Sequence, residues 1–132
     1  MNFFLDTNIC IYFLKGKKEE ISKNLKRIKP EQVKIPSIVK AEILLGAAKS
    51  QNSKKNKDLI LRFLEPFEII PFGDTEAEIY SEIRSDLEKK GKPIGPNDLL
   101  IAATVISGNG TLITNNVNEF KRVPSLKVEN WE

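Results

Sequence analysis

The first fourteen residues, MNFFLDTNICIYFL, constrain the fold more than any other part of the chain. The apolar run at 3–5 is typical of a short strand buried on both faces of a parallel sheet. Asp6 follows directly, and the apolar residues at 9, 12 and 13 are spaced like one face of a helix. A carboxylate at this point lies at the carboxyl edge of a sheet, where open α/β folds bind ligands. Asp is equally common in turns and at helix N-caps, so both interpretations of Asp6 remain open.

The rest of the chain alternates between short apolar runs and helical patterns. We expect further strands at 33–35, 67–72, 111–114 and 126–128, and helices within 15–30, 37–48, 58–66, 74–90, 99–107 and 118–121. Ser37 is the expected N-cap of its helix, and the lysine-rich stretch 49–57 is expected to be a loop or a helix end. This order predicts one parallel, three-layer α/β domain over residues 1–132.

The composition excludes several classes of function. The chain has no histidine and a single cysteine, Cys10, which removes His-based acid–base catalysis, Cys–His nucleophiles, zinc sites and internal disulfides. A bound metal would therefore need oxygen ligands, which suit Mg²⁺ or Mn²⁺. The net charge of +3 leans only mildly toward an anionic partner. Without a long apolar run or a basic leader followed by an apolar core, we expect a cytoplasmic protein and no membrane association.

Three acids stand out because their neighbours in the sequence are apolar. Glu42 lies inside an apolar helical pattern, where burial is costly unless the carboxylate is paired or bound to a cation. Asp98 opens a helix, a position that the helix dipole also favours for structural reasons. Each acid alone has a structural explanation, including a solvent-facing Glu42. Together with Asp6 they can meet at one sheet edge, and a divalent cation would relieve their mutual repulsion.

Four segments carry a resemblance to a known family: FLDTNICIYFLKG, AEILLGAAKSQ, GKPIGPNDLLIAAT and TLITNNVNEFKRVPSLKVENW. In this order and spacing they resemble a PIN domain, specifically a VapC-type toxin of bacterial toxin–antitoxin pairs. The resemblance implies a PIN-like three-layer α/β/α sandwich with a parallel sheet of four or five strands. It also implies an endoribonuclease that uses one or two Mg²⁺ or Mn²⁺ ions, with Asp6, Glu42 and Asp98 as its catalytic and metal-binding acids. Asn8 and Asn97 fall beside two of these acids as supporting residues.

The last motif departs from the pattern of many PIN domains. These carry an Asp two residues after the motif's Thr, whereas this chain has Asn116 two residues after Thr114. Glu119 is therefore the candidate for a fourth acid, with Thr114 and Asn116 in supporting roles. Whether protein groups or substrate phosphate would hold a second cation stays open.

The resemblance further implies an RNA substrate, which in similar toxins includes tRNA, and inhibition of translation. It also implies a homodimer and a cognate VapB-type antitoxin whose C-terminal part covers the acids. The lysines expected to contact RNA, or alternatively to form only a solvated face, are Lys15, Lys17, Lys18, Lys49, Lys54 and Lys55.

Two other classes of protein are alternatives to a PIN domain. Aspartyl-nucleophile phosphatases need a second Asp at the position of Asn8, and receiver domains need paired acids after their first strand, so both are disfavoured. The serious alternative is a catalytically weak or inactive PIN domain that binds RNA or protein.

Overall fold

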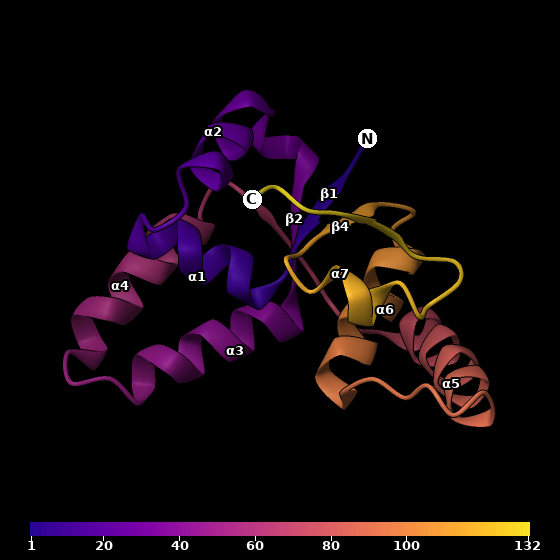
Figure 1. Cartoon of the computed structure of the whole chain (residues 1–132). Coiled ribbons are helices and arrows are strands. Elements are labelled where there is room, and N and C mark those ends of the chain that lie inside the picture. The colour runs from indigo at the N-terminus through magenta and orange to yellow at the C-terminus, as the bar shows by residue number, and fades with distance from the viewer.

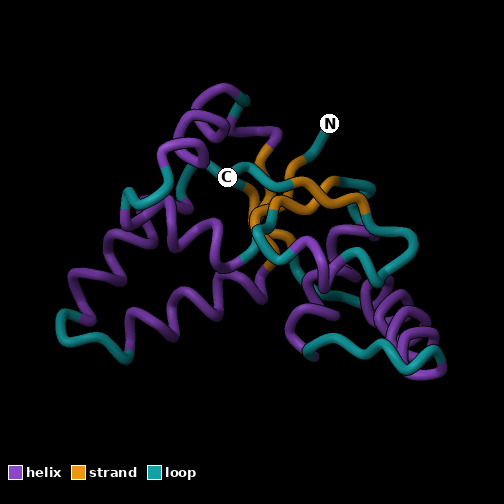
Figure 2. The backbone as a smooth tube through the Cα atoms, viewed as in Figure 1, coloured by secondary structure: helices purple, strands orange, loops and turns teal.

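The computed structural model describes residues 1–132 and contains a five-stranded parallel sheet. In chain order its strands are β1 (Phe3–Leu5), β2 (Val33–Pro36), β3 (Glu68–Ile70), β4 (Thr111–Ile113) and β5 (Lys127–Glu129). They lie in the order β3-β2-β1-β4-β5, with β1 at the centre. The short strands occupy the middle of the molecule and helices flank them (Figure 2). The predicted parallel α/β architecture is confirmed.

The helices divide between the two sides of the sheet. Helices α1 (Thr7–Lys15), α2 (Glu19–Arg27), α3 (Ser37–Ala48) and α4 (Ser53–Leu64) come from the first half of the chain. Helices α5 (Asp74–Lys89), α6 (Pro96–Ser107) and α7 (Val117–Phe120) come from the second half, and a 3₁₀ turn, η1, spans Pro30–Gln32. In Figure 1, α1, α3 and α4 lie on one side of the strands, and α5 and α6 lie on the other. None of these helices combines the length and apolar character that a membrane span requires.

The strand order places a crevice at the carboxyl edge between β1 and β4. From β1 the chain moves outward through β2 to β3, and it then returns to the opposite side of β1 to form β4 and β5. Such a reversal leaves the carboxyl ends of the two central strands uncovered by connecting chain. The Asp6 N–H donates to the Ile113 carbonyl at 3.1 Å and so joins the ends of β1 and β4.

The core forms around β1, whose Phe4 and Leu5 are buried. Phe4 lies directly beneath the turn that joins α6 to β4. A Cβ on Gly108 or on Gly110 would come within 2.5 Å of the Phe4 ring. The absence of a side chain at these two positions therefore allows the turn to close over the ring, which fixes the start of β4 against β1.

Three local predictions were wrong. Helix α4 begins at Ser53 rather than Asp58, because lysine favours helices and the first turns expose all but one side chain, which leaves no apolar periodicity to detect. Pro36, not Ser37, occupies the N-cap of α3, and no side chain caps that helix. Strand β3 ends at Ile70, one residue before Pro71, which lacks the N–H that a ladder needs.

Candidate active site

Asp6 lies at the carboxyl end of β1 and is the N-cap of α1. Its Oδ1 accepts a hydrogen bond from the Ile9 N–H at 2.9 Å, and its Oδ2 accepts one from the Thr114 hydroxyl. The residue is only 5% exposed. Burial raises the pKa of Asp6 from 3.8 to about 6, although the bonds from Thr114 and Ile9 favour the ionised form. The two interpretations left open by the sequence therefore do not exclude each other: Asp6 is a cap and also a buried carboxylate at the crevice.

Glu42 projects from α3 and connects three helices. Its Oε1 accepts a 2.6 Å hydrogen bond from the Thr7 hydroxyl in α1, and its Oε2 accepts one of 3.4 Å from the Asn97 amide in α6. The residue is half-buried, so it does not simply face solvent. It also faces the other acids, since its charge contributes to raising the pKa values of Asp6 and Asp98.

Asp98 and Glu119 form the other wall of the site. Asp98 is in the first turn of α6, and Glu119 is in α7. The two carboxyl groups are close enough to affect each other's pKa, and a shared proton would relieve the repulsion between them. Burial, followed by the charge and hydrogen bond of Glu119 and the charges of Glu42 and Asp6, raises the pKa of Asp98 to about 7. The structure thus brings the candidate fourth acid to the predicted three.

The position of Glu119 is fixed by donors on either side. Its Oε1 accepts from the Gly95 N–H at 3.1 Å, and its Oε2 accepts from the Asn116 amide. Burial acts to raise the pKa of Glu119, but these bonds and the one with Asp98 outweigh it, and the net shift is downward. Asn116 therefore acts as a donor that orients Glu119, a role that an Asp at the same position would not perform.

The remaining supporting residues differ in how close they lie to the acids. Thr114 links Asp6 to the last motif, because its hydroxyl donates to Asp6 and accepts from the Asn116 N–H at 3.0 Å. Asn97 contacts Glu42, as described above. Asn8 is exposed, and its backbone N–H, rather than its side chain, contributes to the surroundings of Asp6.

Two contributors were missed by the sequence analysis. The first is Thr7, whose hydroxyl makes the shorter of the two hydrogen bonds to Glu42. The second is Gly95, whose N–H donates to Glu119. Both residues are adjacent in sequence to a motif acid or its helix: Thr7 follows Asp6, and Gly95 precedes Pro96 at the start of α6. A search for hydroxyl and N–H donors flanking the acids would have found them.

The donor set fits an oxygen-preferring divalent cation. The charges of Asp6, Glu42 and Glu119 all act on Asp98, and none of the six ion pairs of the chain involves any of these four acids. Their oxygens are ligands of the kind that Mg²⁺ and Mn²⁺ prefer. As they stand, no three of the chain's Asp, Glu or Cys side chains form a group that could hold a metal ion. The charge of Arg122 acts on Glu119, whereas no cation of the protein is paired with Asp6, Glu42 or Asp98.

The structure separates the six lysines predicted to contact RNA. Lys18 lies 3.8 Å from the Glu132 carboxylate and over the Tyr12 ring, 5.6 Å from its centroid. The other five, which are exposed and make no ion pair, are Lys15, Lys17, Lys49, Lys54 and Lys55. Lys15 lines the same cavity as Glu42, whereas Lys54 and Lys55 lie at the start of α4. Tyr12, Phe13 and Phe63 pack against the core.

The sequence of this chain matches a known family and named relatives. Residues 3–126 match the model of the PIN domain family. The chain is 44% identical over 133 aligned residues to a protein of Rickettsia felis named ribonuclease VapC2, covering 100% of this chain and 99% of that protein. It is 36% identical to a protein of Salmonella typhimurium named tRNA(fMet)-specific endonuclease VapC, covering 99% and 98%.

A solved structure matches the fold over the whole chain. It is the crystal structure of VapBC2 from Rickettsia felis bound to a DNA fragment from their promoter. The match has a TM-score of 0.92 and 41% sequence identity, and it covers 100% of both chains.

Proposed function

The chain belongs to the PIN domain family, within its VapC group, and we propose that it is the endoribonuclease toxin of a toxin–antitoxin pair. The observation that carries this proposal is the meeting of Asp6, Glu42, Asp98 and Glu119 at the carboxyl edge between β1 and β4. None of these acids forms an ion pair with a Lys or Arg, although the charge of Arg122 acts on Glu119. Such a cluster is suited to phosphodiester hydrolysis assisted by a divalent cation.

The proposed cofactor is Mg²⁺ or Mn²⁺, as one or two ions held by Asp6 and Asp98 together with Glu42, and with Glu119 as the fourth acid. Such an ion neutralises charge on the phosphate and makes water a stronger acid. Support comes from the donor set, which contains carboxylate oxygens and no nitrogen or sulfur ligand. The raised pKa values of Asp6 and Asp98 also mean that a cation would compete with protons for these oxygens.

Hydrogen bonds within the chain hold the Glu42 and Asp6 carboxylates in fixed orientations. Glu42 is fixed from two sides by Thr7 and Asn97, so an oxygen of its carboxylate is positioned to accept a proton from an attacking water. Asp6 is fixed by its cap bond and by Thr114. Because an attack by water does not require the ribose 2′-OH, selection of RNA would rest on the shape of the strand and on contacts outside the acids.

The first experiment is cleavage of total cellular RNA by the purified, antitoxin-free protein. The reactions contain Mg²⁺, Mn²⁺ or EDTA, and an Asp98→Ala variant serves as the control. A discrete product that requires both the metal and Asp98 supports the nuclease, and sequencing its ends identifies the target. An initiator tRNA transcript is a second substrate, because the Salmonella relative is named for tRNA(fMet). Equal cleavage by Asp98→Ala would refute the assignment.

The alternative function is an RNA- or protein-binding module without catalysis. One observation favours it: Asn116 donates to Glu119 at the position where many PIN domains place another acid. A well-folded protein that binds Mn²⁺ but leaves every RNA intact would support this alternative. Cleavage that depends on the metal and on Asp98 would exclude it.

We also propose a VapB-type antitoxin as partner, a homodimer, inhibition of translation and a cytoplasmic location. The antitoxin is supported by the VapBC2 assembly of the Rickettsia match. The homodimer is proposed from the resemblance to VapC toxins alone. The free, buried thiol of Cys10 is compatible with a reducing compartment. Co-purification with the product of an adjacent small reading frame, and sedimentation of the purified chain, test the first two. Ribosome-dependent translation in an extract with and without the protein tests the third.

A further inference from the structure

The two sides of the sheet carry opposite charge. Residues 1–62 contain 14 Lys and Arg against six acids, whereas residues 63–132 contain seven against 12. The first set forms α1 to most of α4, and the second forms α5 to α7, which lie on the other side of the strands (Figure 1). The modest net charge of the chain therefore conceals one basic side. A polyanion would approach the acid cluster from the side of α1, α3 and α4.

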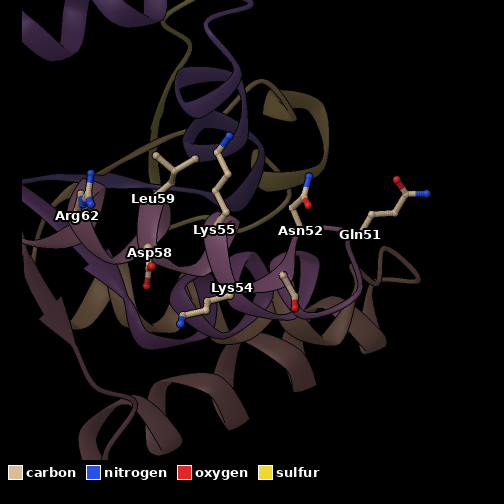
Figure 3. Close-up of a pocket in the computed structure, with 8 residues that line it drawn as sticks. Gln51, Asn52, Lys54, Lys55, Asp58, Leu59 and Arg62 are labelled. Carbon is tan, nitrogen blue, oxygen red and sulfur yellow. The ribbon is translucent and has the colours of Figure 1, made fainter.

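Helix α4 presents a basic stripe on this side, formed by Lys55, Leu59 and Arg62. These residues are spaced at i, i+4 and i+7 and share one face of the helix. In Figure 3 Lys55 and Leu59 point to the same side, whereas Lys54 and Asp58, which line the same pocket, point to the other. Neither Lys55 nor Arg62 belongs to any of the six ion pairs. Leu59, 47% exposed, lies between the two charges. We call these three residues the α4 stripe.

A cavity of about 430 Å³ connects the α4 stripe to the acid cluster. Leu59 of the stripe and Glu42 of the acid cluster both line it, and so does Lys15. Most of its remaining wall is apolar and comes from α1, α3 and α4. The polar groups in the wall include Ser50 and Asn56, which hydrogen bond to each other at 2.8 Å. We call this space the α4 cavity.

Gly46 keeps the α4 cavity open. It lies in the interior of α3, one turn after Glu42, and lines the cavity. A Cβ at this position would meet no heavy atom within 4 Å, and the backbone does not adopt a positive φ. Packing therefore does not require glycine here, although glycine destabilises a helix interior by roughly 0.5–1 kcal/mol relative to alanine. The consequence of glycine is extra free space beside an acid of the site.

We propose that the α4 stripe and the α4 cavity bind the single-stranded RNA next to the scissile phosphate, an inference that rests on the proposed ribonuclease function. Lys55 and Arg62 contact backbone phosphates, and one unpaired base enters the cavity past Leu59. The stripe and cavity would then determine which RNA is cut.

The shape and chemistry of the cavity favour a base. An unstacked base has apolar faces and a polar edge, and proteins that read single-stranded RNA bind both. The cavity offers apolar walls for the faces, while the Asn56 side chain, which uses one amide N–H on Ser50, offers its carbonyl oxygen and its other N–H for the edge. The flanking cations fit the phosphates on either side of the base. A double helix is disfavoured, because its bases are stacked and cannot enter a cavity.

Two sets of variants separate the phosphate contacts from the base contact. The first pair is Lys55→Ala/Arg62→Ala, with Lys89→Ala/Lys127→Ala as a control that removes the same charge from exposed positions outside the basic side. The second pair is Gly46→Leu, which fills the cavity, with Gly46→Ala as its control. Binding of a fluorescein-labelled initiator tRNA transcript is measured by anisotropy in EDTA between 50 and 200 mM salt, where no metal-dependent cleavage interferes. Urea unfolding verifies that each variant is folded.

The two contacts have different expected signatures. Loss of two phosphate contacts should reduce the slope of log K against log salt by roughly 1.4, because a single strand contributes about 0.7 per contact. Gly46→Leu should weaken binding roughly 5- to 100-fold, the range for loss of one stacked base, with an unchanged salt slope. Lys89→Ala/Lys127→Ala should bind like the wild type, and Gly46→Ala, which adds one methyl group to the cavity, should weaken binding less than Gly46→Leu. On sequencing, the products of Gly46→Leu in Mn²⁺ should show altered site selection.

The remaining outcomes contradict either this inference or the proposed function. If the wild type binds the transcript but Lys55→Ala/Arg62→Ala matches its charge control, the stripe does not contact RNA. If Gly46→Leu matches Gly46→Ala, the cavity does not bind a base. Variants that bind RNA normally but no longer bind the antitoxin would assign the surface to the partner protein instead. If the wild type neither binds nor cuts RNA, the proposed function itself fails.

Discussion

Replacement of Asp6 by Asn should stabilise the metal-free protein while abolishing cleavage. Burial raises the pKa of Asp6 from 3.8 to about 6. One pKa unit corresponds to 1.36 kcal/mol, so the ionised form costs the folded state about 3 kcal/mol relative to a solvated Asp. Asn has no charge to desolvate, and it caps a helix about as well as Asp does. Some of the gain is offset because the Thr114 hydroxyl loses an ionised acceptor. We expect a net gain of about 1–3 kcal/mol at pH 8.

The sign of the pH dependence follows from the direction of the shift. Between pH 3.8 and about 6 the folded protein binds more protons at Asp6 than the unfolded chain does. The stability contributed by the protonated carboxyl is therefore fully present below pH 3.8 and is lost as the pH rises through about 6. Asp6→Asn has no carboxyl group at this position, so its stability does not fall for this reason as the pH rises. The difference in stability between variant and wild type should be small near pH 4, increase toward pH 7 and then remain constant.

Urea unfolding in EDTA at pH 4.5, 6 and 8 measures this difference. The single tryptophan, Trp131, is a suitable probe, because it is buried and packs against Phe3 with ring centroids 5.7 Å apart. A gain of 1–3 kcal/mol corresponds to an increase in the midpoint of roughly 0.5–2 M urea. Asp58→Asn, an exposed control in α4, should shift the midpoint little at any pH. Added Mg²⁺ should stabilise the wild type and have little effect on Asp6→Asn.

Two results would refute this reasoning. Asp6→Asn could be less stable than the wild type at pH 8, which would mean that the hydrogen bonds of the carboxylate outweigh its burial. Alternatively, the variant could differ from the wild type by the same amount at every pH. Its stabilisation would then not arise from the charge of Asp6.

Three further predictions concern the site and the sheet. Thr7→Val removes the hydroxyl that holds Glu42. The rate of cleavage should therefore fall roughly 10- to 100-fold, while the Mn²⁺ affinity measured by calorimetry changes less. An unchanged rate of cleavage would show that this hydrogen bond does not position Glu42 for the reaction. Gly110→Ala places a methyl group within 2.5 Å of the Phe4 ring, and overpacking of this kind should destabilise the fold by roughly 1–3 kcal/mol in urea unfolding, whereas an unchanged midpoint would mean that the turn can shift. Mn²⁺ affinity should increase between pH 5.5 and 8 as Asp98, with a pKa of about 7, loses its proton, and a flat profile would exclude this carboxyl as a ligand.

The sequence was most informative where local pattern and topology agree. The apolar run before Asp6 predicted the central strand, and the reversal of strand order places the end of that strand beside the end of β4. The convergence of Asp6 with Glu42 and Asp98 followed from this parallel arrangement, together with the motif resemblance. Nothing in the order of residues, however, specifies that Glu42 is held by Thr7, because 35 residues separate them and the contact exists only after α1 packs against α3.

The start of α4 was less predictable, and the error had a consequence for the site. With the helix expected to begin at Asp58, the lysines at 54 and 55 belonged to a loop or a helix end and were not expected to share a helix face with Leu59 or Arg62. In the structure α4 begins at Ser53, which aligns Lys55 with Leu59 and Arg62. Arg62 therefore could not have been singled out from the sequence. Its position depends on the register of a helix whose exposed first turns carry no apolar signal.

In Asp6, the structural role as an N-cap and the proposed role as a metal ligand support each other. The cap bond from Ile9 uses Oδ1, and the Thr114 bond uses Oδ2, so the backbone start of α1 and the end of β4 together fix the carboxylate in one orientation. A freely rotating carboxylate at a crevice would lose conformational entropy when it binds a cation, whereas this one has already lost it on folding. The same two bonds favour the ionised form against the burial that opposes it. The cap therefore does not compete with ligand binding for Asp6; it prepares a buried, oriented anion whose remaining electrostatic cost a cation can relieve.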